Sequence, residues 1–151
     1  MIEVSTIIHA DCELLFDLEL DMNEHSASLR ESGESFTTST GHAQLGLGDE
    51  VTFTASHFGL RQRLTSRITE FERPFRFVDE QVTGPFRSMR HEHTFTPQAD
   101  GSVLMSDRFV VAAPLGALGA LALRAGLKRY LRALLVQRAA HIKAVAESAS
   151  A

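Results

Sequence analysis

Between residues 34 and 112 the sequence repeats one pattern, in which runs of strand-forming residues are separated by stretches containing Gly, Pro or Asp. The runs cover residues 34–40, 49–58, 60–72, 75–82, 87–96 and 102–112. Four of the five separators are short enough for hairpins or tight corners, so strands that are neighbours in sequence should pair with each other in antiparallel fashion. The pattern therefore predicts an antiparallel meander of six strands.

The flanking segments add one strand and several helices. Residues 2–9 alternate in polarity and are rich in β-branched side chains, which predicts a first strand. Asp11 is placed to cap a short helix over residues 12–20, and a second short helix is expected near residues 23–29. After Pro114, apolar residues recur mostly every three or four positions, which predicts a long C-terminal helix. Its apolar positions are Leu118, Leu121, Ala125, Leu127, Leu131, Leu134, Leu135, Ala139, Ile142 and Val145.

This order of elements predicts an α+β fold. A long amphipathic helix can bury its apolar stripe only against one face of the sheet, and a twisted sheet curves around it. We therefore expect a seven-stranded antiparallel curved sheet wrapped around the C-terminal helix. No internal repeat, linker or low-complexity segment interrupts the chain, so we expect a single domain over residues 1–151.

Composition and charge exclude several classes of protein. The net charge of −4 argues against a DNA-binding protein, because neutralising phosphates requires a surplus of Lys and Arg. Cys12 is the only cysteine, which rules out an intrachain disulfide and fits a reducing compartment. The first residues lack the pattern of a signal peptide, and the most apolar run, 109–127, is too broken for a membrane span. We therefore expect a soluble, cytoplasmic protein.

Four segments carry a resemblance to a known family. They are "IIHADCELLFDLELDMN", "GPFRSMRHEHTF", "DGSVLMSDRFVV" and "PLGALG" before the last helix. Together with the element order, they resemble the helix-grip fold of the SRPBCC superfamily, which includes START lipid-transfer domains and polyketide cyclase/dehydrase-like proteins. This resemblance extends over essentially the whole chain and implies an apolar cavity between the sheet and the C-terminal helix.

The segment "RHEHTF" places two histidines on an expected strand. His91 and His93 share a face with Met89 and Phe95, and this face carries the apolar residues. The partner strand has Val103, Met105, Asp107 and Phe109 on one face. If the loop "PQADG" closes a regular hairpin, Thr96 pairs with Ser102, which places His93 opposite Met105 and His91 opposite Asp107. All of these side chains would then face inward.

An inward carboxylate needs a partner, and His91 is the nearest candidate for Asp107. We interpret His91, His93 and Asp107 as the polar end of an apolar cavity that orients a ligand. Alternatively, these groups satisfy one another or the backbone and touch no ligand. The candidate ligand-binding residues are Phe53, His57, Leu64, Phe77, Met89, His91, His93, Phe95, Met105, Asp107, Phe109 and Leu118.

The same polar residues are candidates for metal binding and for catalysis. His91, His93 and Asp107 form a plausible three-ligand set, but a bare "HEH" is a weak metal signal and the third ligand depends on the assumed register. We therefore predict neither a metal nor a cofactor. As an acid–base group, a His91 held by Asp107 suits cyclase or dehydratase chemistry. The sequence does not decide whether the protein is an enzyme, although a binding protein is favoured.

The C-terminal helix is rich in cations. Arg124, Lys128, Arg129, Arg132, Arg138 and Lys143 are opposed only by Glu147. We expect a solvated outer face, and the alternative is contact with an anionic membrane surface or a ribosome. Three functions remain: carriage of a small apolar ligand such as a lipid, isoprenoid or aromatic polyketide, which we favour; cyclase or dehydratase catalysis; and an interaction module that uses this helix. Monomer and homodimer both remain open.

Overall fold

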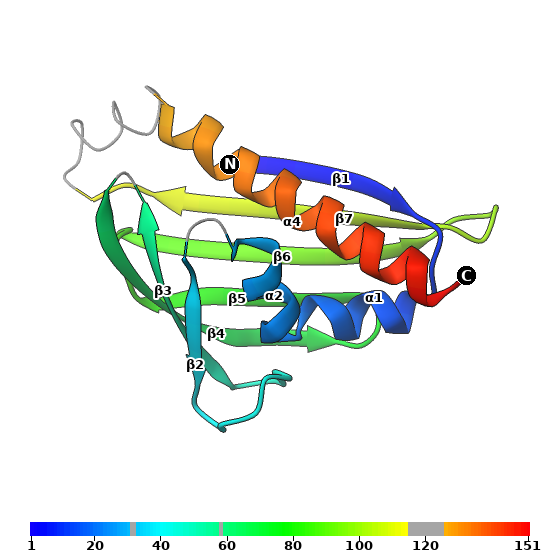
Figure 1. Cartoon of the computed structure of the whole chain (residues 1–151), viewed down its shortest axis with the longest axis horizontal. Coiled ribbons are helices and arrows are strands. Elements are labelled where there is room, and N and C mark those ends of the chain that lie inside the picture. The colour runs from blue at the N-terminus through cyan, green and yellow to red at the C-terminus, as the bar shows by residue number, and fades with distance from the viewer. Residues whose placement is uncertain (31–32, 58, 115–125) are drawn as a thin grey trace.

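The computed structural model describes residues 1–30, 33–57, 59–114 and 126–151. Seven strands form one antiparallel sheet in the order β1-β7-β6-β5-β4-β3-β2 (Figure 1). The strands are β1 (Ile2–Ile8), β2 (Ser35–Thr38), β3 (Glu50–His57), β4 (Leu60–Glu72), β5 (Arg76–Thr83), β6 (Ser88–Pro97) and β7 (Val103–Ala112). The predicted meander is confirmed from β2 to β7, and β1 returns to pair with β7.

Two short helices follow β1. The first is α1 (Cys12–Glu19), and Asp11 caps it by accepting hydrogen bonds from the backbone N–H groups of Glu13 and Leu14. The second is α2 (Met22–Ser28), whose N-cap Asp21 accepts from the backbone N–H of Asn23. Each aspartate satisfies N–H groups that have no partner within the helix. The predicted cap at Asp11 is confirmed.

The long C-terminal helix is α4 (Lys128–Ala149), which packs against β1 and both short helices (Figure 1). Its small or apolar residues Ala139, Ile142 and Ala146 are buried in the core. Two of its cations bind backbone carbonyls of β1, an edge strand: Arg132 donates to Glu3, and Lys143 donates to Ile7. The helix therefore covers one edge of the sheet. The part of the predicted helix before residue 126, including Leu118 and Arg124, lies outside the described residues.

A cluster of aromatic rings forms the core beneath α1. The ring of Phe16 meets those of Phe71, Phe77 and Phe95 edge to face, with centroids 5.1, 5.5 and 5.7 Å apart. Such edge-to-face pairs add to the stabilisation that comes from burying aromatic area. This cluster fills the space between α1 and the sheet, next to the C-terminal half of α4.

The predicted register of the β6–β7 hairpin is wrong by two residues. His93 lies opposite Asp107 and Pro97 opposite Val103, where the prediction paired His93 with Met105. Ser102 is part of the turn, because its backbone N–H and hydroxyl both donate to the Asp100 carboxylate. Since side chains alternate with a period of two, a two-residue shift leaves every inward residue facing inward. The predicted faces are therefore correct although the predicted pairs are not.

Candidate functional site

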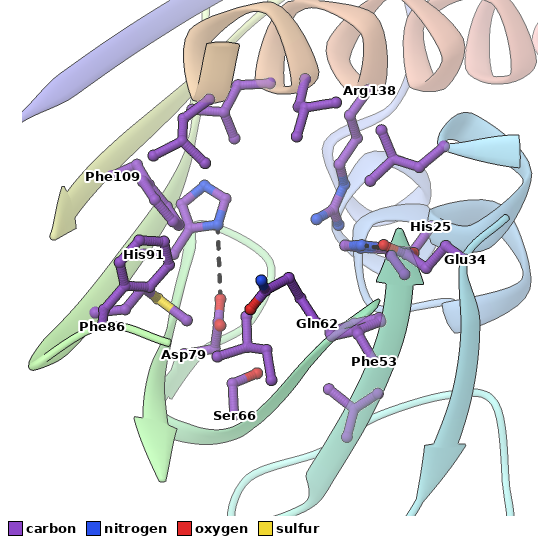
Figure 2. Close-up of a pocket in the computed structure, with 18 of the residues that line it drawn as sticks. His25, Glu34, Phe53, Gln62, Ser66, Asp79, Phe86, His91, Phe109 and Arg138 are labelled. Carbon is purple, nitrogen blue, oxygen red and sulfur yellow. Dashed lines mark ion pairs between the residues drawn. The ribbon is translucent and has the colours of Figure 1, made fainter. Parts of the chain in front are cut away.

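A cavity of about 910 Å³ lies between the sheet and α4 (Figure 2). Most of its wall is apolar and comes from α2, from strands β3 to β7 and from the first half of α4. This wall includes Leu20, Met22, Leu45, Val51, Phe53, Ala55, Leu64, Ile68, Phe77, Met89, Phe109, Leu131, Leu134 and Leu135. The volume falls within the range of about 300–1,000 Å³ that is typical of small-molecule pockets.

Polar side chains interrupt this wall on two sides. In Figure 2, Asp79, His91, Gln62 and Ser66 lie on one side and His25 and Glu34 on the other, while Arg138 points down from α4. At another position in the wall, a polar contact joins β3 to α4: His57 Nδ1 lies 2.6 Å from the Tyr130 hydroxyl. The cavity therefore presents an apolar middle with polar groups at separate positions around it.

Cross-strand pairing brings the two histidines and two aspartates together. Asp79 on β5 lies opposite His91 on β6, and His93 on β6 lies opposite Asp107 on β7. His91 Nε2 forms a 2.9 Å hydrogen bond with Asp107 Oδ1. His93 Nδ1 lies 3.0 Å from the same oxygen, although its geometry is not that of a hydrogen bond. The predicted pairing of His91 with Asp107 is thus present, as a diagonal contact.

Asp79 lies next to His91 and His93, on the side of the imidazole rings that faces the cavity. Its Oδ1 lies 3.8 Å from His91 Nδ1 and 3.5 Å from His93 Nε2. The sequence prediction did not include Asp79, although the signal was available: alternation along β5 from the inward Phe77 places Asp79 inward as well. Each imidazole therefore lies between Asp107 behind it and Asp79 in the cavity wall.

A buried ion pair connects this group to the helices. Arg138 on α4 lies 2.5 Å from the Glu19 carboxylate and also donates to the Glu19 backbone carbonyl at 2.8 Å. Glu19 Oε2 lies 3.6 Å from His93 Nδ1. The prediction of a solvated outer face is wrong for Arg138, which is 8% exposed, whereas Lys128, Arg129 and Arg132 are exposed. The prediction rested on the positive charge of the side chain alone. Arg138 lies instead on the inward face of α4, together with Leu134 and Leu135.

Burial and neighbouring charges set the pKa values of this group. For His93, burial disfavours the imidazolium, but the carboxylates of Asp107, Asp79 and Glu19 outweigh it and raise the pKa to about 9. For His91, burial and the nearby His93 lower the pKa. Burial opposes ionisation of Asp107, yet contacts with both histidines hold its pKa below the ordinary value. His91 is therefore neutral at pH 7 and His93 is cationic.

His25 and Glu34 form a second polar pair on the other side of the cavity (Figure 2). His25 Nε2 lies 3.2 Å from Glu34 Oε1, and the His25 ring stacks on Phe53 with centroids 4.4 Å apart. Burial lowers the pKa of His25 well below its usual value and raises that of Glu34 to about 7. Neither residue stood out in the sequence, because they are in short polar segments without clear periodicity.

The cavity wall contains most of the predicted ligand-binding residues. Those that line it are Phe53, His57, Leu64, Phe77, Met89, His91, His93 and Phe109. Phe95, Met105 and Asp107 do not: Phe95 packs under Phe16, Met105 is buried in the core, and Asp107 lies behind the histidines. Phe75, which the predicted strand 75–82 included, precedes β5 and is 53% exposed. Leu118 lies outside the described residues.

A curved antiparallel sheet that holds a C-terminal helix and encloses a cavity defines the helix-grip class of protein. The family model for polyketide cyclase/dehydrase and lipid transport matches residues 1–147. The chain therefore belongs to this family, and the predicted SRPBCC fold is confirmed. A search of the curated proteins found no match. Among the described residues, no helix has both the length and the apolar character needed to cross a membrane.

Solved structures share the fold at low sequence identity. TTHA0849 from Thermus thermophilus has a TM-score of 0.80 and 17% identity, covering 99% of both chains. A START superfamily protein from Mycobacterium smegmatis has a TM-score of 0.70 and 12% identity, covering 97% of both chains. The di-domain ARO/CYC StfQ from the steffimycin biosynthetic pathway has a TM-score of 0.65 and 16% identity; the match covers 99% of this chain and 46% of that one.

Proposed function

We propose that this protein binds a small, mostly apolar molecule in the cavity between the sheet and α4. The observation that carries the proposal is the cavity of about 910 Å³, whose apolar wall is interrupted by a few convergent polar groups. Apolar surface provides most of the binding free energy, while fixed polar groups orient the ligand and discriminate between ligands. The family, described by polyketide cyclase/dehydrase activity and lipid transport, supports a ligand of this type.

The positions of the polar groups favour a ligand with polar substituents at more than one place. Asp79 and His91 offer a carboxylate and a neutral imidazole on one side, and Gln62 and Ser66 add an amide and a hydroxyl nearby (Figure 2). The rings of Phe53, Phe86 and Phe109 lie in the wall and suit flat apolar surfaces. An aromatic polyketide-like molecule fits this arrangement better than a simple hydrocarbon chain, because a hydrocarbon has no group that can form hydrogen bonds with these polar side chains.

Native mass spectrometry tests the proposal directly. We expect freshly purified protein to carry a co-purifying molecule, because a large apolar cavity takes up apolar compounds from the cell extract. Organic extraction followed by mass spectrometry identifies the compound, and adding it back should restore the mass of the complex. If the protein emerges with no bound compound and also fails to bind a panel of lipids, isoprenoids and aromatic polyketides, the proposal is wrong.

Acid–base catalysis on the bound molecule is a second candidate function. The observation that favours it is the orientation of His91, whose Nε2 is bonded to Asp107 while Nδ1 lies on the Asp79 side, in the cavity wall. A neutral imidazole with a fixed tautomer can accept and return a proton at neutral pH. The same mass spectrometry separates the two functions, because a substrate is returned with changed mass or chromatographic mobility and a cargo is returned unchanged.

A further inference from the structure

We infer that Asp79, His91 and His93 form a binding site for one divalent transition-metal ion, whose remaining coordination positions face the cavity. Each residue offers one ligand atom, and these atoms lie within 4.8 Å of one another. All three side chains line the cavity. The inference goes beyond the proposed function and does not depend on it, because the ion would bind whether or not an organic ligand is present.

The separations of the ligand atoms suit a metal ion. In a tetrahedral site with bonds of about 2.1 Å, ligand atoms are about 3.4 Å apart. Asp79 Oδ1 is 3.5 Å from His93 Nε2 and 3.8 Å from His91 Nδ1. Both distances to the carboxylate oxygen are thus within a few tenths of an ångström of the tetrahedral value, and the two nitrogens lie within 4.8 Å of each other, close enough for one ion to bridge them after small side-chain shifts.

Asp107 supports the site from behind. Metal-binding histidines usually present one ring nitrogen to the ion and the other to a carboxylate, which fixes the orientation of the ring. Here Asp107 Oδ1 lies 2.9 Å from His91 Nε2 and 3.0 Å from His93 Nδ1, and Asp107 does not line the cavity. The two nitrogens that remain, His91 Nδ1 and His93 Nε2, are the ones nearest Asp79.

Packing holds the two rings in place. The His93 ring stacks on Phe77 with centroids 4.2 Å apart, and the His91 and Phe109 rings form a T-shaped pair with centroids 5.1 Å apart. Both histidines are buried, and Asp79 is only 16% exposed. Ligands held in this way lose little conformational entropy when a metal ion binds.

The surrounding charges favour a divalent cation. Asp79, Asp107 and Glu19 contribute three carboxylates to this buried group, and Arg138 contributes one guanidinium. With both imidazoles neutral, as metal ligands must be, two negative charges remain unbalanced. Two imidazoles and one carboxylate, with open positions, form a ligand set typical of Zn²⁺ or non-haem Fe²⁺ sites. The open positions would accept water or an oxygen atom of a ligand in the cavity.

Titration of untagged, chelator-treated protein with ZnCl₂ and CoCl₂ tests the inference. Calorimetry should show that each protein molecule binds one metal ion tightly. The Co²⁺ complex should show the visible absorption of a four- or five-coordinate site. Asp79→Asn should weaken binding by at least about tenfold, and Asp107→Asn by about 10- to 100-fold through loss of ring orientation. The matched control is Glu80→Gln on the same strand, which alternation places on the opposite face; it should bind like the wild type.

X-ray absorption of the wild-type Zn²⁺ complex keeps the test independent of any folding defect in the variants. Scattering from two imidazoles supports the inference, whereas one imidazole or none overturns it. Absence of stoichiometric binding by the wild type, or equal binding by a folded Asp79→Asn variant, also overturns it. These measurements use the metal ion alone, so a negative result leaves the proposed binding of an apolar molecule intact.

Discussion

At the scale of single residues, Glu34 shows how burial alone can control ionisation. Its side chain is 6% exposed and its carboxylate lies 3.2 Å from His25, a neutral imidazole at pH 7. Arg138 and His57 act on Glu34 only at longer range, and they lower its pKa less than burial raises it. The pKa rises from 4.5 to about 7, so the folded state favours the neutral acid.

Glu34→Gln should therefore stabilise the protein above neutral pH. A raised pKa gives a stability contribution that is complete below pH 4.5 and is lost as pH rises through about 7. The variant lacks this loss, so we expect it to be more stable than the wild type at pH 8, by on the order of 1–3 kcal/mol, and nearly equal at pH 4.5. Urea denaturation across this range measures the difference.

Two controls isolate the effect of Glu34. Titration of His25 contributes to both proteins and cancels in the comparison to first order. Glu3→Gln removes an exposed carboxylate and should leave the pH dependence unchanged, because Glu3 lies on the solvent side of β1. Parallel pH profiles for the wild type and Glu34→Gln would show that burial of Glu34 does not control its ionisation.

At the scale of elements, the Glu19–Arg138 ion pair joins α1 to α4. Glu19 is 1% exposed, so its carboxylate depends on Arg138 for compensation. Removing one partner of a buried ion pair costs about 3–5 kcal/mol, because the other charge stays buried without compensation. The pair connects α4 to the end of α1. It also places the negative charge of Glu19 next to His93 in the cavity wall.

We therefore expect Arg138→Met to destabilise the protein by about 3–5 kcal/mol. Arg129→Met, on an exposed part of the same helix, should change stability by no more than about 0.5 kcal/mol. Adding Glu19→Leu to Arg138→Met should recover much of the loss, since an apolar pair leaves no charge buried. Urea denaturation of the single and double variants measures the coupling. Equal midpoints for Arg138→Met and Arg129→Met would contradict the prediction.

At the scale of the whole molecule, the sheet and helices form a solid core at one end and a cavity at the other. Phe16 fills the space under α1, whereas the first half of α4 faces the cavity with Leu131, Leu134 and Leu135. Apolar surface left around such a space is available to a ligand and contributes less to the stability of the empty protein. A substitution that fills the cavity with a larger side chain should therefore weaken ligand binding and change the stability of the protein little.

Ala55→Trp is designed to fill this cavity. Ala55 is buried in the cavity wall on β3, and the chain has no tryptophan, so the new indole is also a unique fluorophore. We expect binding of the co-purified compound, or of a hydrophobic fluorescent probe, to weaken at least about tenfold while the folded state is retained. The control Ser56→Trp puts the same ring on the exposed outer face of β3. Equal binding by both variants would place the ligand elsewhere.

Sequence patterns predicted the elements and the inward faces because both depend on local, periodic properties. Alternation along residues 88–97 was sufficient to point His91 and His93 inward, and the three-to-four spacing located the helix that covers the sheet. The pairing of residues across strands was not predicted correctly, since the hairpin register depends on how Ser102 and Asp100 build the turn. The ligand-binding role of the cavity residues stays a prediction.

A curved antiparallel sheet, a closing helix and a buried strand with two histidines could all be predicted from the chain, because burial of apolar side chains imposes periods that are visible along it. Which charges meet depends instead on how the elements pack. Glu19, Asp79, Asp107 and Arg138 come from a helix, two strands and a second helix, and their interaction energies depend on distances of a few ångströms. No periodicity in one dimension encodes those distances, so the polar centre of the cavity emerges only when these elements pack together.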